Sequence, residues 1–213
     1  MFEKFSEELL EAFKHPLPGK SAHKQLMPYL KINKHIQPPQ LLSTRKGAVM
    51  ALIYPIENIP HLLLIERPVY EGVHSGQLAF PGGKIDATDA NSLSAALRET
   101  KEEVGIGHEV IKVAGSLTEV FVFASNFLVF PYVGIINEAP KIIREEKEVA
   151  GILEIPVHTF FDPYILKEKP IQSALGLTLN APYYDLNGKV LWGATAMMVS
   201  ELCTIITQHK IEI

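Results

Sequence analysis

Three glutamates stand close together in one short stretch of the chain, at Glu99, Glu102 and Glu103. On a helix, their i, i+3 and i+4 spacing gathers them on one face, and Arg98 adjoins that face. Like charges at this spacing repel, and a hard divalent cation removes the repulsion because it prefers carboxylate oxygens, water and phosphate. The stretch therefore predicts a cation site for phosphate chemistry. A solvated acidic helix face is the alternative that the spacing alone leaves open.

The sequence around the glutamates indicates a helix packed on a sheet. Residues 92–104 have helical periodicity. Apolar runs bounded by proline predict strands at 47–54 and 61–66. The face of the helix expected to pack on the sheet comprises Leu93, Ala96, Leu97, Thr100 and Val104. Further strands are expected at 110–122, 127–136 and 149–155.

Helical signals also occur at both ends of the chain. Apolar residues at helical spacing predict an amphipathic helix over 2–14, and a short helix is expected over 22–30. Pro38 and Pro39 mark a boundary. We therefore expect an N-terminal helical extension over 1–45.

The remainder, residues 46–213, is expected to form one domain. Asn187–Gly188 predicts a hairpin, and a helix over 194–208 closes the chain. Strands that enclose one helix, with another helix at the end, predict an α/β sandwich of the α+β kind.

Bulk composition excludes several classes of protein. The 213 residues are 47% hydrophobic and 21% charged, as in soluble globular proteins. A net charge of -4 does not provide the broad positive surface that nucleic-acid binding needs, so we expect no nucleic-acid partner. The single cysteine, Cys203, precludes an intrachain disulfide and is expected to be a buried thiol. Without an apolar leader or membrane-spanning stretch, we expect a cytoplasmic protein with no membrane partner.

The stretch that contains the glutamates resembles the Nudix box, which reads G-x5-E-x7-R-E-U-x-E-E-x-G-U with U aliphatic. Gly83 is followed by five residues and Asp89, and after eight more residues by the run Arg98-Glu99-Thr100-Lys101-Glu102-Glu103-Val104-Gly105-Ile106. Aspartate replaces the first glutamate of the box, the loop is one residue longer, and Thr100 replaces an aliphatic residue. The resemblance implies a Nudix-type α/β/α sandwich with a mixed central sheet.

Two further segments are similar to coenzyme A diphosphatases, a group that shares the longer loop. One runs from Leu63 to Arg67 and resumes at 74–83, and the other spans 191–196. The resemblance covers residues 46–206.

Family resemblance also implies roles for the acidic residues. Glu99 and Glu103 would be the principal ligands of Mg²⁺ or Mn²⁺, with Glu102 completing the cluster. The general base comes either from the box or from a later loop. Glu148 is our candidate in the loop at 144–148, and a solvated charge is its alternative.

Candidate substrate contacts lie upstream of the helix. Gly82 and Gly83 would let the backbone turn and approach metal or phosphate, although an ordinary turn needs the same residues. Arg67 and Gln77 would bind phosphate or order the loop, and His74 would touch ligand or be solvated. Trp192 is interpreted as packing, with a stacking platform for a nucleobase as the alternative. The run 121–123 is interpreted as core.

Three functions compete. The first is hydrolysis of coenzyme A or a derivative to 3′,5′-ADP and 4′-phosphopantetheine. The second keeps the chemistry but acts on NADH, ADP-ribose or a dinucleoside polyphosphate. The third is a ligand sensor with no hydrolase activity, which the intact acidic cluster disfavours. The expected partner is a small coenzyme A-like nucleotide, and the oligomeric state is left open, with a homodimer considered.

Overall fold

An eight-stranded mixed sheet forms the middle layer of the protein in the computed structural model, which describes residues 1–29, 44–72, 74–172 and 178–213. The path of the sheet is β3-β2-β1-β7-β5; β4 pairs with β1, β6 with β7 and β8 with β2. β1 and β7 are parallel, and the other pairs are antiparallel. The strands are β1 (Arg45–Ile56), β2 (Ile59–Glu66), β3 (Leu78–Ala79), β4 (Gly82–Lys84), β5 (Lys112–Ser116), β6 (Val120–Val122), β7 (Phe127–Ile135) and β8 (Gly151–Pro156).

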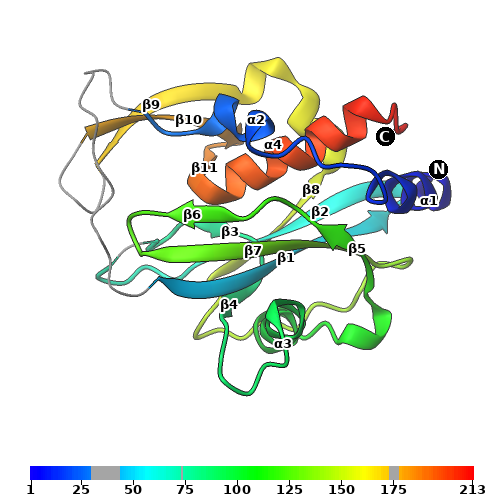
Figure 1. Ribbon diagram of the computed structural model, residues 1–213, viewed down its shortest axis with the longest axis horizontal. Helices are drawn as coiled ribbons and strands as arrows, with labels where there is room; N and C mark the ends of the chain where they lie inside the picture. The colour runs from blue at the N-terminus through cyan, green and yellow to red at the C-terminus, as the bar shows by residue number, and fades with distance from the viewer. Residues whose placement is uncertain (30–43, 73, 173–177) are drawn as a thin grey trace.

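Helices cover both faces of this sheet (Figure 1). On one face lies α3 (Ser92–Val104), and on the other lies α4 (Gly193–Gln208) with α2 (Lys20–His23) beside it. This arrangement confirms the predicted α/β/α sandwich. The remaining helical elements are α1 (Phe2–Ala12), η1 (Lys24–Leu26), η2 (His108–Val110), η3 (Val157–Phe161) and η4 (Pro163–Ile165). None of the helices in the described ranges is long and apolar enough to span a membrane.

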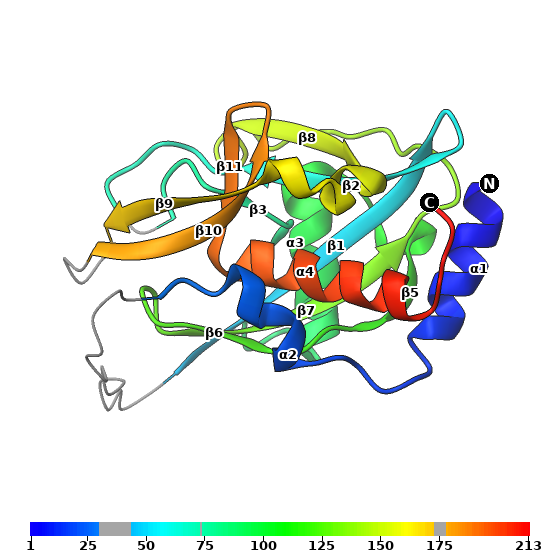
Figure 2. The ribbon, with the colours of Figure 1, turned by 90° about the horizontal axis from the view of Figure 1, so that it is seen from above.

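A smaller antiparallel sheet flanks α4 (Figure 2). It contains β9 (Leu166–Gln172), β10 (Thr178–Leu186) and β11 (Lys189–Trp192). The hairpin predicted at Asn187–Gly188 joins β10 to β11 and is confirmed, with φ angles of 54° and 88° at the two turn residues.

Alternation along β1 divides the core in two. Met50 and Leu52 pack in the cluster against α3, whereas Ala51 and Ile53 pack in the cluster against α4. The sheet is therefore buried on both faces, which explains its continuous apolar strands.

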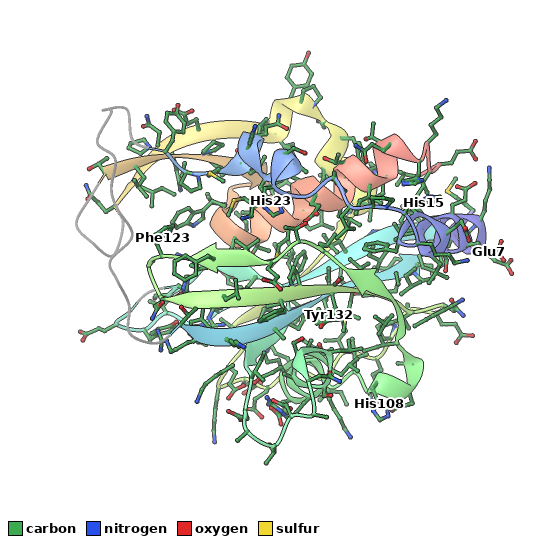
Figure 3. The ribbon with its side chains drawn as sticks, viewed as in Figure 1. Glu7, His15, His23, His108, Phe123 and Tyr132 are labelled. Atoms are coloured by element: carbon green, nitrogen blue, oxygen red, sulfur yellow. The ribbon has the colours of Figure 1, made fainter. Side chains whose placement is uncertain are left out.

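The N-terminal helices pack into the α4 side of the core. Phe5 and Leu9 of α1 are fully buried there. His23 of α2 lies 2.9 Å from Glu201 Oε2 of α4, in the layer above the sheet (Figure 3). The division into an extension over 1–45 and a domain over 46–213 remains a prediction.

Several predicted element bounds were wrong. The strand expected over 110–122 is two strands, β5 and β6, because the chain leaves the ladder after Leu117, where Thr118 N donates to Glu201 Oε2 instead. The helix expected over 22–30 begins at Lys20 and ends in a 3₁₀ turn at Leu26, since Tyr29 instead bridges to Asn180 of β10. Leu30 and the Pro38–Pro39 boundary lie outside the described residues.

Two further interpretations also differ. Gly82 and Gly83, expected at a turn of the backbone, belong to β4, because Gly82–Lys84 pairs with β1. In the run 121–123, Phe123 is 49% exposed and stacks edge-on against Phe121, so the run is not wholly core. Trp192 is half-buried at the end of β11.

Candidate active site

The helix that carries the three glutamates is α3, and its ends are well defined. Asn91 Oδ1 accepts a hydrogen bond from Ser94 N at 2.9 Å, which caps the N-terminus. Gly105 ends the helix in the left-handed region, with φ of 73°. The predicted span 92–104 is thus confirmed. Ala96, Thr100 and Val104 are buried, as expected of the sheet-facing side.

Glu103 is the most buried of the three glutamates, with 4% exposure. Its Oε2 accepts a hydrogen bond from Gly82 N at 2.8 Å. The pKa of Glu103 is raised to about 7, mainly by burial. The charges of Glu99 and Glu148 also raise it, whereas the Gly82 N–H and Arg67 lower it. The ionised carboxylate of Glu103 is therefore not fully compensated by positive charge or hydrogen-bond donors around it.

Glu99 lies directly against the glycine pair. A Cβ atom at Gly83 would lie 2.5 Å from Glu99 Cδ, so only glycine leaves room for the carboxylate. Gly82 has a φ of 150°, and a side chain there would overlap Ala48 O. Burial raises the pKa of Glu99 as well, although Arg98 opposes the shift. Gly83 therefore allows a close approach of β4 to α3, and Gly82 allows a close approach of β4 to β1, beyond what a turn requires.

Arg98 organises the acidic cluster. Its Nε and Nη2 donate to the two oxygens of Asp89 at 3.0 and 2.9 Å. Its Nη1 donates to Glu99 Oε1 at 2.9 Å and to Glu102 Oε2 at 2.8 Å. Asp89, whose function the sequence left undetermined, thus holds the guanidinium in a bidentate contact that fixes its direction.

The loop with Glu148 is anchored to the C-terminus of α3. Glu145 N donates to Glu103 O at 3.0 Å, and Ile143 N donates to Val104 O at 2.9 Å. A side chain at Gly105 would collide with Ile143, so the glycine permits this approach. The exposed Glu148 raises the pKa of both Glu99 and Glu103, which places its charge beside the cluster.

Arg67 supplies a second guanidinium on this side of the sheet. It lowers the pKa of Glu103 and follows the last residue of β2. Its Nε is buried and has no hydrogen-bond partner among the described residues. A buried donor without a partner is costly, so this nitrogen suits an anionic ligand.

The loop after Arg67 closes on itself. Arg67 N donates to Gln77 O at 3.0 Å, and His74 Nδ1 lies 3.0 Å from Gln77 Oε1. His74 adopts a left-handed backbone, with φ of 71°. Within the described ranges, no contact brings the His74 or Gln77 side chain to the acidic cluster. Their predicted contact with substrate remains a prediction.

A divalent cation fits the chemistry of this cluster. Glu99 and Glu103 are desolvated, repel each other and have raised pKa values. Glu99 Oε2 and Glu103 Oε1 accept no hydrogen bond from any residue that the structure describes. As the side chains stand, with Arg98 between Glu99 and Glu102, no three acidic, histidine or cysteine side chains in the described ranges already enclose an ion.

The fold and site together define a class of protein, an α/β/α sandwich with an acidic helix held against a glycine-rich strand. The NUDIX domain model matches residues 44–169, more than half of the chain, and the chain belongs to the Nudix family. It is 35% identical over 167 residues to "Uncharacterized Nudix hydrolase NudL" of Enterobacter sp. (strain 638), covering 76% of this chain and 83% of the relative. The protein of the same name from Escherichia coli (strain K12 / DH10B) is 33% identical over 168 residues, covering 76% and 83%.

Solved structures share the fold. A MutT/nudix family protein from Enterococcus faecalis has a TM-score of 0.54 and 18% identity, covering 81% of this chain and 66% of that chain. A Nudix hydrolase from M. smegmatis, RenU, has a TM-score of 0.52 and 13% identity, covering 81% and 91%. The chain is thus a Nudix pyrophosphohydrolase, of a family that generally uses divalent cations to hydrolyse nucleoside diphosphate derivatives.

Proposed function

We propose that the protein hydrolyses the diphosphate linkage of coenzyme A or its derivatives, giving 3′,5′-ADP and 4′-phosphopantetheine. The position of the segment 74–83, which resembles coenzyme A diphosphatases, carries this proposal. Gln77 O binds the main chain of Arg67, and Gly82 N binds Glu103. The C-terminal end of this segment, at Gly82 and Gly83, therefore lies against the acidic cluster.

The residues of the chain divide the chemistry among them. Glu99, Glu102 and Glu103 would hold Mg²⁺ or Mn²⁺, and the ion supplies positive charge against the phosphate oxygens when bound. Arg98 directs Glu99 and Glu102. Arg67 holds a non-bridging oxygen of the substrate through its Nε–H, which has no partner among the residues that the structure describes.

Glu148 acts as the general base in this proposal. Its carboxylate takes a proton from a water whose oxygen bonds to phosphorus, while the bond from that phosphorus to the bridging oxygen breaks. The second phosphate leaves with the bridging oxygen and the bonding electron pair, as a phosphate monoester. Two observations support this assignment. Glu148 is exposed in its loop, so water can reach it. Its charge also raises the pKa values of Glu99 and Glu103. We expect Glu148→Gln to lower kcat roughly a hundredfold, whereas the neighbouring Glu146→Gln leaves kcat unchanged.

A substrate panel with Mg²⁺ and with Mn²⁺ tests the proposed substrate, with products identified by mass spectrometry. It compares coenzyme A, 3′-dephospho-coenzyme A, NADH, ADP-ribose and a dinucleoside polyphosphate. We expect coenzyme A to have the highest kcat/KM, and loss of the 3′-phosphate to lower it roughly tenfold or more, because a charged hydrogen bond is lost. Equal kcat/KM for the 3′-dephospho compound, or a higher value for NADH or ADP-ribose, would contradict the coenzyme A assignment. Absence of hydrolysis throughout would favour a ligand sensor.

A further inference from the structure

The end of β2 presents two charged side chains to opposite faces of the main sheet. Leu64 packs in the core against α4, and Ile65 packs in the core against α3. Because side chains alternate along a strand, Glu66 follows Leu64 to the α4 face and Arg67 follows Ile65 to the α3 face. On that face, the charge of Arg67 acts on Glu103.

On the α4 face, Glu66 is held by Lys189 of the small sheet. Lys189 Nζ donates to both carboxylate oxygens of Glu66 at 2.6 Å. Lys189 is the first residue of β11, directly after the Asn187–Gly188 turn, and β11 packs against β3. The ion pair therefore joins the small sheet to the end of β2.

The main chain of Glu66 anchors the loop with Glu148. Ala150 N donates to Glu66 O at 2.8 Å, and Glu66 pairs with Gly151 in the ladder between β2 and β8. A Cβ atom at Gly151 would lie 3.1 Å from Glu66 Oε2, so glycine leaves room for the carboxylate. One residue thus connects Lys189, the Glu148 loop and Arg67.

We propose that Lys189 is a positioning residue for diphosphate hydrolysis. By its ion pair with Glu66, Lys189 holds the end of β2 in place. This orients Arg67 on the opposite face and keeps Glu66 O in position to accept from Ala150 N in the loop with Glu148. The inference rests on the proposed function, because positioning matters only where Arg67 and Glu148 act. Lys189 lies beyond residue 169, where the match to the family model ends. The ion pair with Glu66 therefore depends on the segment that follows the matched region.

The test compares Lys189→Met with Lys167→Met. Lys167 forms a similar ion pair with Asp185, at 2.5 Å and with nearly the same exposure, but it does not touch Glu66. We expect Lys189→Met to lower kcat roughly tenfold with KM within about twofold, because displaced catalytic groups lose alignment. We expect Lys167→Met to stay within about twofold of the parent chain.

A double-mutant cycle sharpens this test. Glu66→Gln should lower kcat as Lys189→Met does, and the double variant should lower it no further, because both remove one ion pair. Lys189→Arg should restore most of kcat, since a guanidinium can contact both oxygens of Glu66. Hydrogen exchange of the peptide 145–151 should be faster in Lys189→Met than in the parent or Lys167→Met.

Unchanged kcat and unchanged exchange in Lys189→Met would overturn the inference. A rise in KM alone, with Glu66→Gln like the parent, would also overturn it, because Lys189 would then contact substrate directly. If the parent hydrolysed no diphosphate, the proposed function would fail, and the exchange measurement would still decide whether Lys189 holds the loop.

Discussion

Two glutamates are buried on opposite faces of the main sheet, and their surroundings differ. Glu201 of α4 has no exposed surface and accepts three hydrogen bonds, from His23 Nε2 at 2.9 Å, Thr118 N at 3.0 Å and Thr118 Oγ1 at 2.6 Å. Glu103 of α3 accepts one hydrogen bond from the described part of the chain, from Gly82 N, and faces other carboxylates. The two carboxylates are similarly buried, but hydrogen bonds offset the loss of hydration at Glu201 much more than at Glu103.

The pKa values express this difference. Burial alone would raise the pKa of Glu201, but the hydrogen bonds from His23 and Thr118 outweigh it and lower the pKa. Burial raises the pKa of Glu103 to about 7, because its donors are too few. A buried carboxylate that accepts a full set of hydrogen bonds stabilises the fold. A buried carboxylate that has few donors and lies beside other carboxylates is suited to bind a cation.

The largest expected effect comes from neutralising Glu103. We expect Glu103→Gln to lower kcat roughly a thousandfold, because the amide keeps the shape but loses the charge toward a cation. Its free energy of unfolding without metal should not fall, since the amide oxygen still accepts from Gly82. Steady-state kinetics and urea unfolding measure both, with Glu146→Gln as control. A kcat within a few-fold of the parent would contradict the assignment of Glu103.

The opposite result is expected on the other face. Glu201→Ala should lower the free energy of unfolding by about 3 kcal/mol, because His23 and Thr118 lose their buried acceptor. Activity per folded molecule should stay within a few-fold of the parent. Urea unfolding, with active-fraction correction of the kinetics, separates the two quantities. An unchanged free energy of unfolding would show that the buried network contributes nothing.

A smaller effect is expected from pH. Because the folded pKa of Glu201 lies below its ordinary value of 4.5, its stabilisation is present above pH 4.5 and is lost as pH falls through the folded pKa. The difference in unfolding free energy between the parent and Glu201→Ala should therefore shrink below pH 4.5. Urea unfolding at pH 7, 5 and 3.5 follows this difference. A constant difference across the series would disagree with the lowered pKa.

The sequence predicted the acidic helix well because its determinants are local. Periodicity placed α3 at 92–104, and the i, i+3, i+4 spacing gathered Glu99, Glu102 and Glu103 near Arg98. The spacing could not predict that Glu103 is buried. Its burial depends on segments distant in sequence, because β4 and the loop at 142–150 pack against α3.

Long-range partners were beyond local patterns. His23 and Glu201 are separated by 178 residues, so no periodicity connects them. β9 was missed because its sequence, LKEKPIQ, mixes charges and proline without alternation. Glu66 went unnoticed for a similar reason, although strand alternation next to Arg67 indicates that the two side chains face opposite ways.

The most direct test is calorimetric titration of Mn²⁺ into the parent, Glu103→Gln and Glu146→Gln at one pH. We expect the parent and Glu146→Gln to bind the ion alike, and Glu103→Gln to bind at least roughly tenfold more weakly, because a charged oxygen ligand is lost. Equal affinity in all three proteins would contradict the claim that the carboxylates of α3 form the cation site.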